Sequence, residues 1–328
     1  YAFVIWYHHG LFVLNISNPE NPEEVSSIYE YPSQTYNYNK IKIFGNYAYI
    51  SVRYQGIDII DISDPTNIHL VGENNNFPSY AEGVTIYHTG NREFTFMSGN
   101  TDGIGIFNTT NVSNPIFIKK FCVLGAAWRP ALKDSYLFVG ARNDGVWVID
   151  VSNPENPKEV AFYYLGGRTG DVEIQGNYLY YSGCWEKLNI VNISNPLNPQ
   201  ILVKSYGRNL VAITLEENWL YGIYGPTHRL LLIFNISDPS NPQLYEFDVP
   251  VYMRDIEKYK ENYLLIAGDE GLFVLDVTNR TNPEIITNIS FGEGIFSLDV
   301  SEPIWSCFRR EEYHRRSSSQ PLRLSQER

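Results

Sequence analysis

A short motif that recurs seven times constrains the fold of this chain more than any other feature. Each copy begins with an apolar run, continues with Asn or Asp, one further residue and Ser or Thr, and then enters a polar turn rich in Pro and Asn. The copies start at Gly10 (GLFVLNISNPENP), Gly56 (GIDIIDISDPTNI), Gly103 (GIGIFNTTNVSNP), Gly145 (GVWVIDVSNPENP), Lys187 (KLNIVNISNPLNP), Leu230 (LLLIFNISDPSNP) and Gly271 (GLFVLDVTNRTNP). A period of roughly 41 to 47 residues indicates a repeat architecture, so the repeat has to be interpreted before anything else.

Each repeat reads as four short strands. The motif supplies one strand and a turn, because Asn, Asp and Ser bond their own backbone and Pro fixes φ and interrupts the ladder. A second strand precedes the motif after a Gly-Asn turn (GNYAYIS from Gly45), and a third lies before that (KIKIF from Lys40). A fourth strand follows the turn (KEVAFYY from Lys158). Four antiparallel strands repeated seven times without helical periodicity predict an all-β fold, a seven-bladed β-propeller.

The two ends of the repeat region complement each other. The chain starts in the middle of a blade with YAFVIWYHHG, which lacks an inner strand. The last repeat is followed by an additional inner strand, GIFSLDV from Gly294 to Val300. We therefore expect the ring to be closed by pairing of the N- and C-terminal strands, which removes an edge that would otherwise template aggregation.

The motif resembles that of the LVIVD repeat family, whose consensus joins a Gly-hydrophobic strand to a D-[IV]-S-[DN]-P-x-N-P turn. The resemblance covers roughly residues 1 to 301. It departs from the consensus at Val112 and Arg280, where the first Pro is missing, and at Ile68, where the second is missing. The resemblance implies a propeller that is often exported or on the cell surface, and it implies no particular reaction. We expect a secreted or cell-surface protein.

Composition limits the class of partner and the extent of the domain. The net charge of −12 argues against nucleic-acid binding, which needs a basic surface. No run of 18 apolar residues is present, so no membrane span is expected. After Ser301 the sequence becomes rich in Arg and Ser and loses the repeat. We predict a propeller over residues 1–301 and a tail outside the repeats over residues 302–328.

Charged residues recur where the chain enters each predicted inner strand. In a propeller these segments, and the loops between second and third strands, open on one face around the central channel. Those at the inner strands are Lys40, Glu82, Arg129, Asp171, Arg208, Arg254, Asp255 and Glu293. The same classes of loop supply His8, His9, Trp128, Trp185 and His228. We expect opposite charges to converge at the channel mouth.

Three interpretations of this charge pattern remain open. In the first, the charges simply neutralise one another around a wet channel. Alternatively, a small polar ligand or glycan binds over the channel through His8, His9, Lys40, Trp128, Arg129, Trp185, Arg208, His228 and Arg254. The third interpretation is a glycosidase or lactonase, which would use Glu82, Asp171, Asp255 and Glu293 as its acid and base. A protein partner is the further alternative for a binding module.

The sequence indicates neither a cofactor nor a metal. There is no HxH, HxxxH or CxxC spacing of the kind that binds zinc. The motifs GxSxG and GxxxxGK[ST] are also absent, so serine-hydrolase and P-loop chemistry are not indicated. The leading prediction is an exported or cell-surface binding module, with the hydrolase as the alternative.

Overall fold

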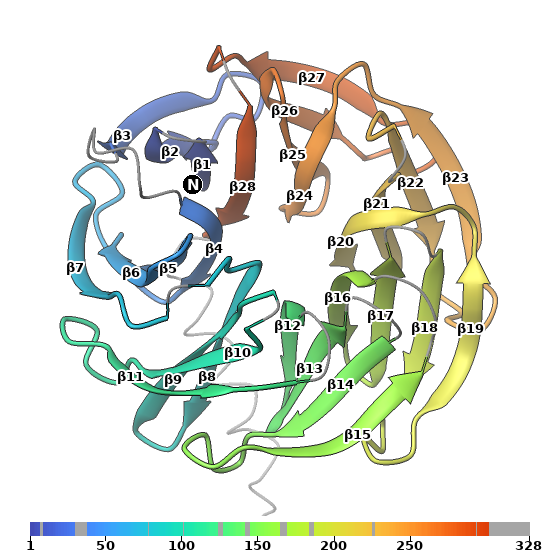
Figure 1. Cartoon of the computed structure of the whole chain (residues 1–328). Coiled ribbons are helices and arrows are strands. Elements are labelled where there is room, and N and C mark those ends of the chain that lie inside the picture. Colours follow the sequence, from blue (N-terminus) through green and yellow to red (C-terminus); the bar gives the residue numbers. More distant parts are fainter. Residues whose placement is uncertain are drawn as a thin grey trace, which may run out of the picture.

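Seven four-stranded antiparallel sheets stand as blades around a common centre (Figure 1). This computed structural model describes residues 1–6, 9–29, 38–77, 79–100, 102–123, 127–141, 145–164, 169–183, 187–224, 227–292 and 294–301. Within these residues no helix is long and apolar enough to cross a membrane. The architecture is the predicted seven-bladed β-propeller.

Each blade contributes one strand to each of four concentric layers. The inner strands are β4 (Tyr38–Phe44), β8 (Gly83–Thr89), β12 (Ala127–Lys133), β16 (Thr169–Gln175), β20 (Leu210–Glu216), β24 (Met253–Tyr259) and β28 (Ile295–Val300). The second strands are β1 (Ala2–Trp6), β5 (Tyr47–Val52), β9 (Arg92–Ser98), β13 (Tyr136–Ala141), β17 (Tyr178–Gly183), β21 (Trp219–Tyr224) and β25 (Tyr263–Gly268). The third strands are β2 (Gly10–Asn15), β6 (Gly56–Asp61), β10 (Ile104–Asn108), β14 (Gly145–Asp150), β18 (Leu188–Asn192), β22 (Leu230–Asn235) and β26 (Gly271–Asp276). The outer strands are β3 (Glu23–Tyr29), β7 (His69–Asn74), β11 (Ile116–Phe121), β15 (Lys158–Tyr164), β19 (Gln200–Tyr206), β23 (Gln243–Asp248) and β27 (Glu284–Ile289).

The ring is closed by the two ends of the chain, as predicted. Strand β28 pairs antiparallel with β1, in a register that sets Ala2 opposite Val300. The resulting sheet has the order β28-β1-β2-β3. Each inner strand also contacts the inner strands of both neighbouring blades, and these contacts run around the whole circle. No blade is therefore left with an uncovered face.

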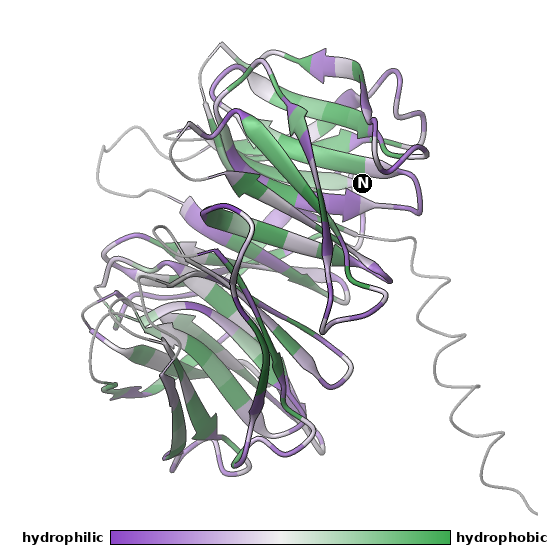
Figure 2. Ribbon diagram, turned by 90° about the vertical axis from the view of Figure 1, so that its right-hand side faces the viewer, coloured by the Kyte–Doolittle hydropathy of each residue, from purple (hydrophilic) through white to green (hydrophobic). Residues whose placement is uncertain are grey.

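The hydrophobic core is divided into seven clusters, one at each junction between neighbouring blades. Strand β5 shows why: Ile50 packs in the cluster shared with the preceding blade, and Tyr49 packs in the cluster shared with the following one. A strand that is covered on both faces needs apolar residues at consecutive positions, not at alternate ones. This explains the continuous apolar runs of the motif, which appear as green strands with purple turns in Figure 2.

The polar half of the motif forms two consecutive side-chain turns in every repeat. In the fourth blade, Asp150 Oδ1 accepts the amide of Ser152 at 2.8 Å, and Asn153 Oδ1 accepts the amide of Glu155 at 3.2 Å. The first bond recurs from Asn15, Asp61, Asn108, Asn192, Asn235 and Asp276. The second recurs from Asn18, Asp64, Asn111, Asn195, Asp238 and Asn279. The turn therefore survives at Asn111 and Asn279 although Pro is missing, because the side-chain acceptor is still present.

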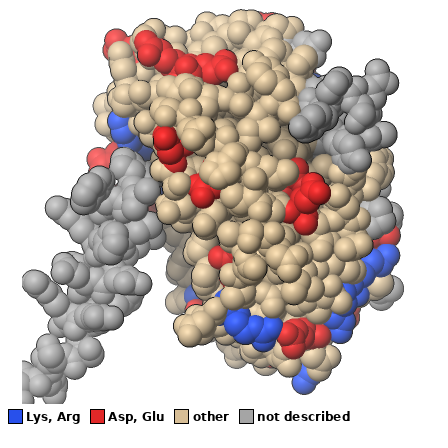
Figure 3. All heavy atoms as spheres, turned by 90° about the vertical axis from the view of Figure 1, so that its left-hand side faces the viewer, with Lys and Arg blue, Asp and Glu red and all other residues tan. Residues whose placement is uncertain are grey.

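The surface agrees with the acidic composition. On the side drawn in Figure 3, acidic side chains are scattered over much of the surface, whereas most Lys and Arg lie toward one end. The residues drawn in colour there form no continuous basic surface of the kind that phosphate backbones require.

The closure generates a first prediction. Removing residues 294–328 deletes β28, exposes the edge of β1 and removes Ile295 and Leu298 from the junction of the last and first blades. Because large buried aliphatic side chains contribute about 2 to 5 kcal/mol each, the shortened protein should melt at a clearly lower temperature and self-associate. Circular dichroism melting and size-exclusion chromatography provide the measurement. Removal of residues 302–328 alone is the control and should change neither property; equal behaviour of both truncations would contradict the closure.

Candidate functional site

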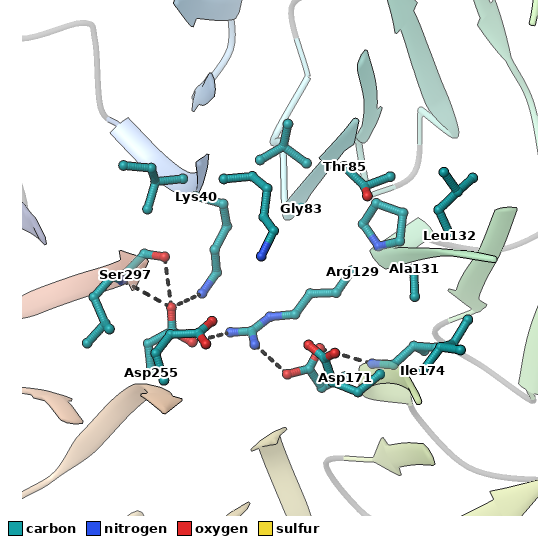
Figure 4. A pocket seen from close by; sticks show the side chains of 18 residues that line it. Lys40, Gly83, Thr85, Arg129, Ala131, Leu132, Asp171, Ile174, Asp255 and Ser297 are labelled. Atoms are coloured by element: carbon teal, nitrogen blue, oxygen red, sulfur yellow. Dashed lines mark hydrogen bonds and ion pairs between the residues drawn. The ribbon is translucent and has the colours of Figure 1, made fainter. Parts of the chain in front are cut away.

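The inner strands surround a cavity of about 200 Å³ at the centre of the ring (Figure 4). Alternate residues of each strand point the same way, so side chains two positions apart form successive tiers along the channel. We call Lys40, Arg129, Asp171, Asp255 and Ser297 the first tier, and Lys42, Thr85, Glu173, Glu257 and Asp299 the second tier. Six of the seven inner strands line the cavity.

A single guanidinium joins the first tier. Arg129 binds Asp171 through one terminal nitrogen and Asp255 through the other, the second contact measuring 3.0 Å. Lys40 Nζ lies 3.0 Å from Asp255 Oδ2, to which the Ser297 hydroxyl also donates at 2.8 Å. These four charged residues come from four blades and form one neutral, connected network, as Figure 4 shows.

The network sets the protonation of its carboxylates. Burial acts to raise the pKa of Asp255, but Lys40 and Arg129 outweigh it and hold that pKa at about 2. Burial raises the pKa of Asp171, against the opposing effect of Arg129 and of the Ile213 amide. Burial, reinforced by Arg129, lowers the pKa of Lys40. Asp255 is therefore ionised at physiological pH and has no proton to donate.

Three channel aspartates also link neighbouring blades. Each accepts a backbone N–H from the inner strand of the next blade, so the inner strands are connected by side chains where no ladder exists between them. The bonds run from Ile213 to Asp171 (3.1 Å), from Leu298 to Asp255 (3.4 Å) and from Ile43 to Asp299 (2.8 Å). Asp171 and Asp255 thus have a structural role whatever else they do.

The second tier was not among the residues predicted from the sequence. It contains three carboxylates and one cation, Lys42, which lies 3.5 Å from Asp299. Burial, and then the charge of Asp171, raises the pKa of Glu173 to about 7, and burial with the charge of Asp299 raises the pKa of Glu257. Period-two alternation was the available signal, since Lys42, Glu173 and Glu257 each follow a first-tier residue by two positions. Among the described residues no group of His, Cys, Asp and Glu is arranged to hold a metal ion.

The predicted entry residues Lys40, Arg129, Asp171 and Asp255 lie within the inner strands, each as the third residue of β4, β12, β16 or β24. The ladder of each of these strands is irregular at or next to this residue. Irregularities of this kind change the direction of a side chain locally, which brings long polar groups over the channel mouth.

The other predicted residues that the structure describes make contacts outside the network. Arg208 pairs with Glu246 on the outer strand β23, and Arg254 pairs with Asp269, the Nε to Oδ1 distance being 2.5 Å. His9 stacks on Trp6, and His228 stacks on Tyr252. Glu82 does not line the cavity, and the buried indole N–H of Trp128 has no partner among the described residues. His8, Trp185 and Glu293 lie outside the described residues.

Seven blades around a narrow, charge-lined channel define the protein as a seven-bladed β-propeller. The LVIVD repeat family matches residues 1–29, 37–76, 124–164, 166–207 and 254–290. Because these segments make up more than half of the chain, the chain belongs to that family.

Solved structures share the fold at low sequence identity. A functionally unknown protein from Desulfotomaculum acetoxidans DSM 771 is 13% identical over 90% of this chain and 97% of its own, with a TM-score of 0.73. The computationally designed Ika8 protein is 9% identical over 90% and 86%, with a TM-score of 0.63. A chain of the mitotic checkpoint complex is 10% identical over 79% of each chain, with a TM-score of 0.62. No curated protein sequence matches the chain.

The network predicts that the loss of Arg129 strongly lowers the stability of the fold. Arg129→Met leaves Asp171 and Asp255 buried without their shared cation, so the free energy of unfolding should fall by about 3 to 5 kcal/mol in urea titrations. Arg92→Met is the control, because Arg92 and Glu155 form a pair in which both side chains are about half exposed. Its effect should stay below about 1 kcal/mol. Similar losses for both variants would show that the network does not stabilise the ring.

The second tier predicts a particular pH dependence. The folded-state pKa of Glu173 lies above its unfolded value, so folding favours the neutral acid, and this contribution is lost as pH rises from about 4.5 to about 7. Glu173→Gln should therefore lose less stability than the parent protein does as the pH rises through this range. Urea midpoints measured at several pH values test this, with Glu20→Gln at an exposed position as the control. Parallel profiles for parent and Glu173→Gln would refute it.

Proposed function

We propose that this LVIVD propeller is an exported or cell-surface interaction module that holds a small polar ligand, a carbohydrate, over the mouth of its channel. The observation that carries the proposal is that the carboxylates of the first tier already have partners within the protein. Both carboxylates share Arg129, and Asp255 also binds Lys40, Ser297 and a backbone amide. Groups so fully engaged hold the ring together and leave recognition to the surrounding face.

Cavity size supports binding over the channel rather than within it. Ligand pockets usually enclose about 300 to 1,000 Å³, more than the roughly 200 Å³ of this cavity. A sugar ring would also have to break ion pairs to enter. Export is proposed from the family resemblance.

The hydrolase alternative is weakened by the same contacts. A glycosidase needs one protonated and one ionised carboxyl group on either side of the scissile bond. Asp171 and Asp255 instead bind the same guanidinium, and Glu82 does not line the cavity. The hydrolase therefore remains the second hypothesis.

A binding screen combined with a hydrolysis screen separates the two functions. We expect the parent protein to be retained on a subset of an immobilised glycan array and to release no chromophore from a panel of chromogenic glycosides and lactones. Glu82→Gln is the matched variant and should not change the array pattern. Turnover by the parent that falls in Glu82→Gln would establish the hydrolase instead, and retention on no glycan would reject the carbohydrate.

A further inference from the structure

One sector of the channel mouth combines aromatic faces with polar atoms. Arg254 extends from β24, and the ladder irregularity between Met253 and Asp255 sets it apart from the regular alternation of the strand. Its guanidinium carbon lies 4.8 Å from the ring centroid of Phe296 and 5.7 Å from that of Tyr252. The guanidinium therefore lies within cation–π distance of two rings.

His228 adds an oriented acceptor to this sector. Its ring stacks on Tyr252, with centroids 4.2 Å apart and an angle of 8° between the planes. Nδ1 lies 2.9 Å from the carbonyl oxygen of Met253, and because a carbonyl only accepts, Nδ1 carries the proton. The Met253 amide donates to the His228 carbonyl at 2.7 Å and fixes the loop. Nε2 of the neutral ring is consequently a hydrogen-bond acceptor, and burial keeps the ring neutral by lowering its pKa.

The ion pair between Arg254 and Asp269 uses only some of the hydrogen-bonding atoms of the two side chains. Arg254 Nε contacts Asp269 Oδ1, and the side chains are 32% and 44% exposed. Among the described residues no hydrogen bond or ion pair engages the two terminal nitrogens of Arg254 or Oδ2 of Asp269. Gly294 leaves room for the pair, because a Cβ there would lie 3.2 Å from Asp269 Oδ1 and 3.3 Å from Arg254 Nε. The sector thus presents donors and acceptors together.

The balance of these groups selects the chemistry of the ligand. An anion would suit Arg254 but meet the Asp269 carboxylate and the acceptor Nε2 of His228. A cation would suit those acceptors but meet Arg254. Hydroxyl groups both donate and accept, so neighbouring hydroxyls on one ring satisfy all three residues without a net charge.

We propose that His228, Tyr252, Arg254 and Asp269 form a subsite for a neutral saccharide ring. The polar atoms bind the vicinal hydroxyls of the sugar, and the edge of the His228–Tyr252 stack lies against its apolar face. This inference rests on the proposed carbohydrate-binding function and adds both the position of the sugar and its lack of charge.

The test uses three neutral methyl glycosides, of glucose, galactose and mannose, titrated into the full chain and followed by saturation-transfer NMR. Glucuronate and glucosamine are the charged counterparts. We expect at least one neutral glycoside to bind more tightly than either charged sugar. Arg254→Met and Asp269→Ala should each weaken that binding about tenfold, the effect of losing one or two hydrogen bonds.

Arg92→Met is the matched control, because Arg92 also pairs with a carboxylate and lies over an aromatic ring, that of Phe94, but on strand β9 of another blade. It should keep the parent's affinity, and His228→Asn, which removes both stack and imidazole, should lose it. Thermal unfolding of each variant verifies folding. Neutral binding that survives in all three sector variants overturns the subsite and leaves the proposed function standing. Tighter binding of a charged sugar overturns the neutral specificity, and binding of no sugar by the parent overturns subsite and carbohydrate function together.

Discussion

The apolar character of both faces of every blade is the constraint on which the rest of the structure depends. Tyr49 and Ile50 are successive residues of one strand, yet each is fully buried against a different neighbouring blade. A sheet of this kind cannot have one face in water, so it needs a neighbour on each side. Only a closed ring satisfies all blades at once, which is why β28 must return to β1.

Closure creates the channel and brings charged side chains from several blades together inside it. Inner strands converge on one axis, and their polar side chains are brought close together. In the first tier the charges balance, since the cations Arg129 and Lys40 pair with the carboxylates of Asp171 and Asp255. In the second tier Lys42 faces three carboxylates, and the pKa values of Glu173 and Glu257 are raised first by burial and then by the charge of a neighbouring aspartate. The centre of the ring is therefore an electrostatic support for the inner strands.

The recognition that we propose uses the face around the channel. Arg254 leaves the regular strand alternation at a ladder irregularity, whereas its neighbour Asp255 belongs to the network below. Two adjacent residues with the same apparent sequence signal thus have different roles. One stabilises the ring, and the other is exposed beside Tyr252 and Asp269.

The sequence by itself determined the number of blades, the order of their strands, the polar turns and the closure of the ring, because these follow from local patterns copied seven times. It also located four residues of the charged network, since they recur at one position of the repeat. Only the tertiary structure decided which of them meet. Arg129 reaches Asp171 across 42 positions and Asp255 across 126, while Arg208 turns to Glu246 on an outer strand. Contacts of this kind depend on the radius of the ring and on the direction of each side chain at a strand irregularity, and neither quantity is encoded in a local run of residues.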